Sequence, residues 1–187
     1  SNKCDGTAGN DQNSLRVSPN HGAVFYIDSG QGQNLDATYV SYSVNNRGGS
    51  TRTNLWVKVD TFTGGKVQLA NTNDSAYPLG DVASSGTATS FFLLKATATT
   101  TSAQSHVVHV YSGKPGLSSS TELYSCSYTF TKVAETIKAA ANKVTSIPAV
   151  TVGAVGTTMN VVVKGNTGTI GSGNATDGSV MWFSPSA

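Results

Sequence analysis

The segment SVNNRGGSTRTNLWVKV (43–59) decides how the fold is read, because two arginines surround a glycine pair between two apolar stretches. A phosphate-binding loop needs a glycine-rich turn that leads into a helix N-terminus, where free N–H groups hold the anion. Here the turn leads into TNLWVKV, whose apolar residues alternate as in a strand. We therefore expect a connection between neighbouring strands, with positive φ angles at Gly48 and Gly49 and with Arg47 and Arg52 as solvated charges.

The same strand pattern continues outward from this segment. Short runs rich in β-branched and aromatic residues are separated by clusters of Gly, Asn, Ser and Asp, which is typical of a β-sandwich. The predicted strands span residues 23–27, 38–44, 54–60, 66–70, 90–96, 106–111 and 122–130. Successive side chains of a strand point to opposite faces, so alternate apolar residues are expected to share the core face. These residues are Val40, Tyr42 and Val44, then Leu55, Val57 and Val59, and finally Tyr124, Cys126, Tyr128 and Phe130.

Composition limits the possible partners and the possible environments. The 187 residues suffice for one large domain or for one domain and part of another. Only 12% of them are charged, and the net charge of +2 is too small to gather a polyanion, so nucleic acid is not an expected partner. The apolar runs are far shorter than the roughly 18 residues that cross a bilayer, so no membrane insertion is expected in this segment.

The two cysteines, Cys4 and Cys126, favour an extracellular protein. They are even in number, far apart and free of any CxxC motif, so we interpret them as a disulfide that ties an N-terminal arm (1–22) to a late strand. Two buried thiols are the alternative. A bridge over so long a loop stabilises the fold mainly by restricting the unfolded chain. The N-terminus lacks the features of a signal peptide, so an exported protein would be represented here in mature or trimmed form.

The rest of the chain suggests two further segments after the sandwich at 23–131. Alanine-rich KVAETIKAAANKV lies in a segment (132–150) that we interpret as a linker, with a short helix as the alternative. Residues 151–187 look like a second β-domain that begins again with an alternating strand and a Gly/Asn turn, and they are too few to complete it.

Several turn and strand motifs resemble those of bacterial surface repeat domains of the immunoglobulin-like type, the group that includes the CARDB and DUF11 families. The matching stretches are YVSYSVNNRGGS, TNLWVKV, YPLGDVASSGTATSFFLLKA and SHVVHVYSG, within residues 35–112. The resemblance implies an immunoglobulin-like antiparallel β-sandwich and a repeat that adjoins other repeats of a parent protein. The N-terminal arm with its cysteine does not belong to the repeat pattern.

Catalytic residue types are few, and none forms a known motif. His21, His106 and His109 lie outside sequences such as GxSxG. His106 and His109 are three apart on a predicted strand, so they face opposite sides and cannot hold one metal together; both are expected to be exposed or half-buried. Glu122 and Glu135 are the only glutamates, and neither is paired with a second acid by the pattern. The sequence therefore indicates a protein that is not an enzyme.

Two kinds of ligand remain open. The loop NTNDSAYPLGD supplies side-chain oxygens from Asn71, Asn73, Asp74 and Asp81, which calcium would accept, although the spacing differs from that of known calcium loops and a plain hydrophilic turn explains it as well. No other cofactor is indicated. The aromatic residues Trp56 and Tyr77 could stack on a sugar, or they could pack in the core.

Together these observations favour a secreted or cell-surface bacterial module that works as an adhesin or stalk repeat, in spacing or in adhesion. Its expected partners are a host or neighbouring cell-surface protein or glycan and the adjoining repeats. A carbohydrate-binding β-sandwich of a secreted protein is the alternative.

Overall fold

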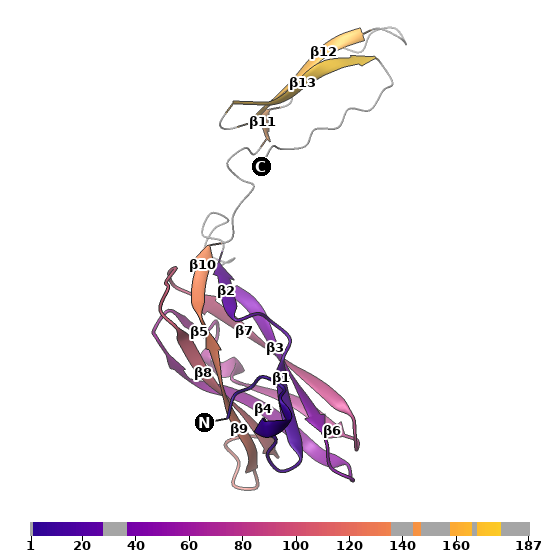
Figure 1. Ribbon diagram of the computed structural model, residues 1–187, viewed down its shortest axis with the longest axis vertical. Coiled ribbons are helices and arrows are strands. Elements are labelled where there is room, and N and C mark those ends of the chain that lie inside the picture. The colour runs from indigo at the N-terminus through magenta and orange to yellow at the C-terminus, as the bar shows by residue number, and fades with distance from the viewer. Residues whose placement is uncertain (1, 28–36, 136–143, 147–157, 166–167, 177–187) are drawn as a thin grey trace. The chain divides into compact units, whose positions relative to one another are not determined.

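The computed structural model describes residues 2–27 and 37–135 and, later in the chain, residues 144–146, 158–165 and 168–176. The chain divides into two compact units, Ser1–Thr136 and Ile137–Ala187, whose strands are labelled in Figure 1. Among the residues so described, no helix has the length and the hydropathy needed to cross a bilayer.

The first unit is an immunoglobulin-like β-sandwich of two four-stranded sheets in which every pairing is antiparallel (Figure 1). In the order of their pairing, the strands of one sheet are β1 (Leu15–Pro19), β3 (Ala37–Asn46), β7 (Thr87–Ala96) and β5 (Val67–Leu69). Those of the other sheet are β6 (Ala76–Val82), β4 (Arg52–Thr63), β8 (Gln104–Ser112) and β9 (Thr121–Phe130). Two single-turn 3-10 helices, η1 (Ala8–Asn10) and η2 (Thr72–Asp74), lie in connections.

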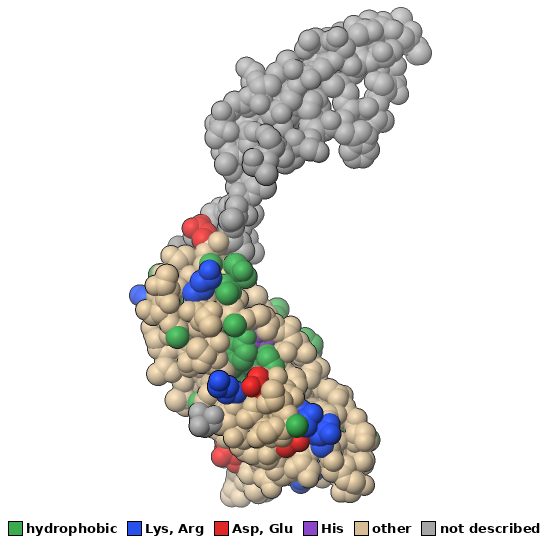
Figure 2. Space-filling view, in the orientation of Figure 1, with side chains coloured by type: hydrophobic (Ala, Val, Ile, Leu, Met, Phe, Trp, Pro, Cys, Tyr) green, Lys and Arg blue, Asp and Glu red, His purple; other side chains and the backbone are tan. Residues whose placement is uncertain are grey.

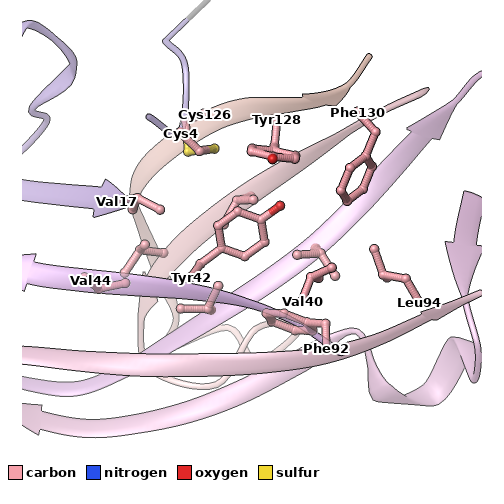
Figure 3. Packing of buried hydrophobic residues seen from close by; sticks show 14 of the residues in the cluster. Cys4, Val17, Val40, Tyr42, Val44, Phe92, Leu94, Cys126, Tyr128 and Phe130 are labelled. Atoms are coloured by element: carbon pink, nitrogen blue, oxygen red, sulfur yellow. A yellow bond between two sulfur atoms is a disulfide. The ribbon is translucent and has the colours of Figure 1, made fainter. Parts of the chain in front are cut away.

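The core forms between the two sheets because the alternating residues of each strand face inward. All ten side chains expected on the core face are buried. Figure 3 shows Tyr42 of β3 and Tyr128 and Phe130 of β9 converging between the sheets, together with Phe92 of β7. Each buried aliphatic or aromatic side chain of this kind contributes about 1.5–3 kcal/mol relative to an exposed one. Sequence alternation alone therefore accounts for the main body of the sandwich.

The connection within residues 43–59 differs from the prediction in two respects. It joins β3 to β4, which belong to different sheets, so it crosses the sandwich instead of closing a hairpin. Gly48 and Gly49 do not adopt positive φ angles. The turn is held instead by the buried side chain of Asn46, which accepts a hydrogen bond from the Gly48 N–H (3.0 Å) and donates to the Ser50 carbonyl (2.8 Å). The hydrogen bonds of this buried polar side chain hold the turn, in place of the positive φ angles expected at the two glycines.

The N-terminal segment is part of the sandwich, so its interpretation as an arm (1–22) was wrong. Leu15 and Val17 are fully buried in β1, which pairs with the second half of β3. The run LRVSP has one β-branched residue and no aromatic residue, so it did not stand out as a strand. Arg47 and Arg52 also contact this segment, through an ion pair with Asp11 (3.5 Å) and a hydrogen bond to the Asn13 carbonyl. They are not merely solvated loop charges.

Residues 2–13 cover the outer edge of β9, which would otherwise carry unpaired backbone groups. Ser127 of β9 donates to the Asn2 carbonyl (2.8 Å) and accepts from the Cys4 N–H (3.1 Å). Two residues earlier in β9, the Gln12 side chain bonds to both the N–H and the carbonyl of Ser125. An uncovered edge strand is a template for pairing with other chains, and this segment removes that template along much of β9.

The Cys4–Cys126 disulfide fixes this covering segment covalently. The two sulfur atoms are bonded, the Cα atoms are 5.2 Å apart, and both residues are buried. Figure 3 shows the bridge at the end of the aromatic core, beside Tyr128. The prediction of a disulfide is thereby confirmed, and the alternative of two free thiols is excluded.

A small parallel pair completes the first unit. Strand β2 (Val24–Ile27) pairs with β10 (Lys132–Glu135) and belongs to neither main sheet. Residues 132–135 were expected to begin the linker or helix at 132–150, and that expectation was wrong for them, because Val133 is buried against the core and its backbone bonds to Thr100. Residues 136–143 and 147–150 of the same segment lie outside the described residues.

The second unit contains one described sheet of three strands. These are β11 (Val144–Ser146), β12 (Thr158–Gly165) and β13 (Gly168–Thr176), which pair antiparallel in that order. Strands β12 and β13 lie within the segment (151–187) that was predicted to begin a second β-domain.

Candidate functional site

His106 lies on the inner face of β8 and is buried, although sequence analysis placed it in an exposed or half-buried position. Its Nε2 is 2.5 Å from the Tyr42 hydroxyl, and its ring stacks on Phe62 with centroids 5.2 Å apart. Burial, and secondarily the charge of His21, lower the pKa of His106 to about 3. The imidazole is therefore neutral at physiological pH and serves as the polar centre of an aromatic core.

His21 closes the edge of β3 beside this core. Its Nδ1 lies 3.1 Å from the carbonyl and 3.3 Å from the amide nitrogen of Ser41, and its ring packs edge-on against Tyr42 and Tyr128. Burial lowers the pKa of His21, while the contact with the Ser41 backbone opposes that effect. A half-buried histidine in this position holds the backbone and faces aromatic rings.

His109 has the opposite environment, on the outer face of β8. Its Nε2 is 2.8 Å from an oxygen of Asp60 in β4, and its Nδ1 contacts Glu122 at the start of β9. Lys58 forms an ion pair with the other oxygen of Asp60 (3.1 Å). Burial alone would raise the pKa of Asp60, but hydrogen bonds from His109, Lys58 and Thr61 outweigh it and leave the pKa lowered.

This ion cluster joins three strands but leaves little room for catalysis. Each ring nitrogen of His109 faces a carboxylate, so neither is free to take a proton from a nucleophile such as the neighbouring Ser125. The two carboxylates also lie on opposite sides of the imidazole, so their oxygens do not converge on one point. Within residues 2–27 and 37–135 and the three described strands of the second unit, no group of acids, histidines and cysteines could hold a metal ion.

Trp56 and Tyr77, the two predicted ligand-binding aromatics, lie on opposite faces of one sheet. Tyr77 stands opposite the buried Val57 in the register of β4 and β6, whereas Trp56 stands opposite Pro78. They cannot form one binding platform.

Trp56 belongs to the outer face and already has partners there. Its indole N–H donates to Asn54 (3.1 Å), and the Lys114 ammonium lies 5.8 Å from the ring centroid. Tyr111 is its cross-strand neighbour on β8. A ligand that stacked on Trp56 would have to displace Lys114, which is held by a cation–π contact.

Tyr77 lies in a hollow of about 220 Å³ that we call the aromatic hollow. Elements β3, η2, β6 and β7 bring its lining together: Tyr39, Asp74, Tyr77, Phe91, Phe92 and Leu93. The Tyr77 ring packs edge-on against Phe91, with centroids 6.0 Å apart. Tyr39 is 68% exposed and Phe91 48%, and they belong with Tyr26 and Leu117 to the large apolar side chains that are exposed on the described part of the chain.

Tyr39 and Phe91 were not predicted as binding residues, although their positions in the sequence carried a signal. Both fall on the alternate positions of strands whose other face carries the core residues Val40, Tyr42 and Phe92. A large aromatic on the solvent face of a strand is a better indication of binding than one at a core position.

Two of the four calcium candidates, Asn71 and Asp81, already accept hydrogen bonds from backbone N–H groups. The Asn71 carboxamide accepts from the Asn73 N–H (3.0 Å) and caps η2, and Asp81 accepts from the Asn54 N–H (2.8 Å) on β4. Asp74 lines the aromatic hollow. The predicted loop is therefore divided between η2 and strand β6, and calcium binding by it stays a prediction.

A larger hollow, of about 460 Å³, lies between β2 and β3 and is lined mostly by apolar and aromatic side chains. Its lining includes Ile27 and Thr38, which lie close to the two ends of the segment (28–36) that is not described. We assign no site to it.

Charge is dispersed over the first unit. Figure 2 shows lysines, arginines and acidic side chains scattered singly or in small groups over the visible face, separated by polar surface.

No protein-family model and no curated protein matches the chain. Among solved structures, the chain is similar to the MSP-domain-like protein SSP-19 of Caenorhabditis elegans, with 12% identity over 60% of this chain and 94% of that one and a TM-score of 0.33. It is also similar to a PapD-like domain of human CEP192, with 7% identity over 68% and 87% of the chains and a TM-score of 0.29. A third similarity is to the CsuC–CsuE chaperone–tip adhesion subunit complex of Acinetobacter baumannii, at 12% identity, 88% and 87% coverage and a TM-score of 0.27. Similarities this weak carry no argument about function.

Proposed function

We propose that the chain is a non-catalytic module of the bacterial cell surface that serves in spacing or adhesion. The observation that carries this proposal is the use of all three histidines within the fold: His106 in the core, His21 on the backbone of β3, and His109 between two carboxylates. The residue type most often used as a general base is thus committed to structure.

The disulfide supports export. Cys4 and Cys126 are paired within a sandwich of ordinary size, and such bonds persist in oxidising compartments outside the cytoplasm. The expected partners are a protein or glycan of a host or neighbouring cell and the adjoining repeats of a parent protein.

The proposal is tested by antibody labelling of intact cells of the bacterium that carries the gene. Labelling without permeabilisation is the expected result, and labelling only after permeabilisation contradicts the proposed location. Beads that carry the purified chain should then adhere to cells more than beads that carry an unrelated sandwich domain. Equal adhesion of the two kinds of bead would remove the adhesive role and leave spacing.

A carbohydrate-binding function is the second candidate, favoured by the cross-strand pair of Trp56 and Tyr111 on the outer face. On a glycan array, Trp56→Ala should abolish binding, whereas Lys114→Ala should strengthen it, because the competing cation over the indole ring is removed. An array on which both variants behave as the native chain does would exclude this site.

A further inference from the structure

We propose that the aromatic hollow at Tyr39, Tyr77 and Phe91 binds a quaternary ammonium group, with the Asp74 carboxylate as its counter-charge. This site is independent of the proposed role in spacing or adhesion, because it is defined and tested on the protein alone. Three features of the hollow carry the inference: the exposure of its rings, the sign of its charge and its size.

The exposed rings provide the binding surface. Phe91 is 48% and Tyr39 68% exposed, and the edge-on contact of Tyr77 with Phe91 sets two ring planes at 66° to each other. The face of an aromatic ring carries a partial negative charge, so rings that border one hollow from different directions attract a cation placed between them. Phe91 and Tyr39 lie on the solvent face of their strands and are open to a ligand, whereas Phe92 lies on the core face and is buried.

The charge of the hollow excludes an anion. Asp74 is the single ionisable group of either sign besides the tyrosines in the described lining, and no lysine or arginine borders the hollow. Lys95, the next basic residue along β7, lines a separate hollow with Phe62 and Leu69. A neutral sugar needs many donors and acceptors, whereas this lining supplies one carboxylate, two tyrosine hydroxyls and the faces of the rings.

A methylated ammonium suits the hollow better than a lysine or arginine side chain. A primary ammonium brings three N–H donors and a guanidinium five, and each donor that lost water without gaining an acceptor would weaken binding. A trimethylammonium group has no N–H donor and presents methyl groups to the rings while it keeps its full charge.

The size of the hollow agrees with this ligand. Its volume of about 220 Å³ is below the roughly 300–1,000 Å³ of pockets that enclose drug-sized ligands. It would accept a head group and leave the rest of the ligand in solvent. Choline and trimethyllysine share this head group, and either can be its source.

The test is a titration of the full chain with choline chloride, followed by amide chemical shifts at constant ionic strength. The expected result is saturable shifts at millimolar choline that are largest for residues 39, 74, 77 and 91. The neutral isostere of choline, in which a tert-butyl group replaces the trimethylammonium group, should bind several-fold more weakly. A peptide with one trimethyllysine, compared with its unmethylated form, distinguishes the two sources.

Variants assign the effect to the named residues. Phe91→Leu and Tyr39→Leu keep apolar bulk but remove a ring, and each should weaken choline binding about two- to fivefold. Asp74→Asn should weaken it and should also reduce the advantage of choline over its neutral isostere. Tyr26→Leu, at an exposed tyrosine outside the hollow, and Glu122→Gln, at an acid on the other sheet, are the matched controls and should leave binding unchanged.

Three results would overturn the proposal. These are the absence of saturable shifts with both choline and the trimethyllysine peptide, shifts that map outside the hollow, and equal binding of choline and its neutral isostere. Because surface location and adhesion are measured separately on cells, failure here leaves the proposed function untouched, and failure there leaves this site untouched.

Discussion

His106 and His109 lie three residues apart on β8, yet their chemical environments differ. His106 faces inward, is 1% exposed and bonds to Tyr42, whereas His109 faces outward and lies between the carboxylates of Asp60 and Glu122. The strand places them on opposite faces, and the sandwich makes one face dry and the other wet. The same side chain is therefore a packing residue on one face and a hydrogen-bonded link between strands on the other.

The largest expected effect concerns the inner face of β9, next to His106. The double variant Cys4→Ala with Cys126→Ala removes the bridge across 122 residues, and it should lower the free energy of unfolding by about 5 kcal/mol in the chain-entropy model. Urea denaturation under non-reducing conditions measures this change. A loss below about 1 kcal/mol would contradict it, since even modest native disulfides contribute more.

Replacement of the buried histidine should come next in size. His106→Ala leaves a cavity and an unpaired Tyr42 hydroxyl in the core, so we expect a loss of about 3 kcal/mol in the free energy of unfolding. The double variant Tyr42→Phe with His106→Leu removes both polar groups and should lose less than His106→Ala does. If the double variant proved the less stable of the two, the hydrogen bond would contribute more than its desolvation costs.

The pH dependence of stability should reflect the burial of His106 on the inner face. Burial lowers the pKa of His106 from 6.5 to about 3, so the unfolded chain takes up the proton first. The free energy of unfolding then has its full value above about pH 6.5. It decreases as the pH falls from there toward 3, by up to about 1.4 kcal/mol per pH unit. Denaturation midpoints at pH 7 and 5 measure the slope.

The Tyr42→Phe with His106→Leu variant is the control for this slope. It should lose most of the pH dependence between 7 and 5 and keep a smaller part from His21, whose pKa burial also lowers. An unchanged slope in the variant would assign the effect to other groups.

Replacement of His109 on the outer face should change the free energy of unfolding least. Asp60 and Glu122 retain side-chain exposures of 33% and 44%, and ion pairs in contact with solvent contribute little. We expect His109→Ala to lower the free energy of unfolding by less than about 1 kcal/mol. A loss as large as that of His106→Ala would remove the distinction between the two faces.

Much of this contrast could be read from the sequence. Alternation identified the core residues of β3, β4 and β9, and it predicted that His106 and His109 face opposite sides. It did not say which face His106 occupies, because a histidine next to valines fits a wet face or a dry one equally well. The hydrogen-bond partner of His106, Tyr42, lies on another strand 64 residues earlier. A contact across the sandwich cannot be predicted from the local alternation of residues.

The missed strands have a similar cause. Strands β1, β6 and β10 are edge or peripheral elements, and in AYPLGDV of β6 the proline and the glycine argue against a strand. Their stability comes from neighbours far along the chain. The aromatic hollow was missed for the same reason, because Tyr39, Tyr77 and Phe91 meet only after three strands and η2 are in place.

The Cys4–Cys126 bridge also determines how the first unit transmits mechanical load. Tension applied at Asn2 and at Phe130 passes through the Cys4–Cys126 bridge. The residues between the two cysteines then carry no tension. Fully extended, they would span roughly 400 Å at about 3.3–3.6 Å per residue, and the bridge prevents this extension. Under such tension the disulfide, and not the unfolding of residues 5–125, limits how far this part of the chain can be extended.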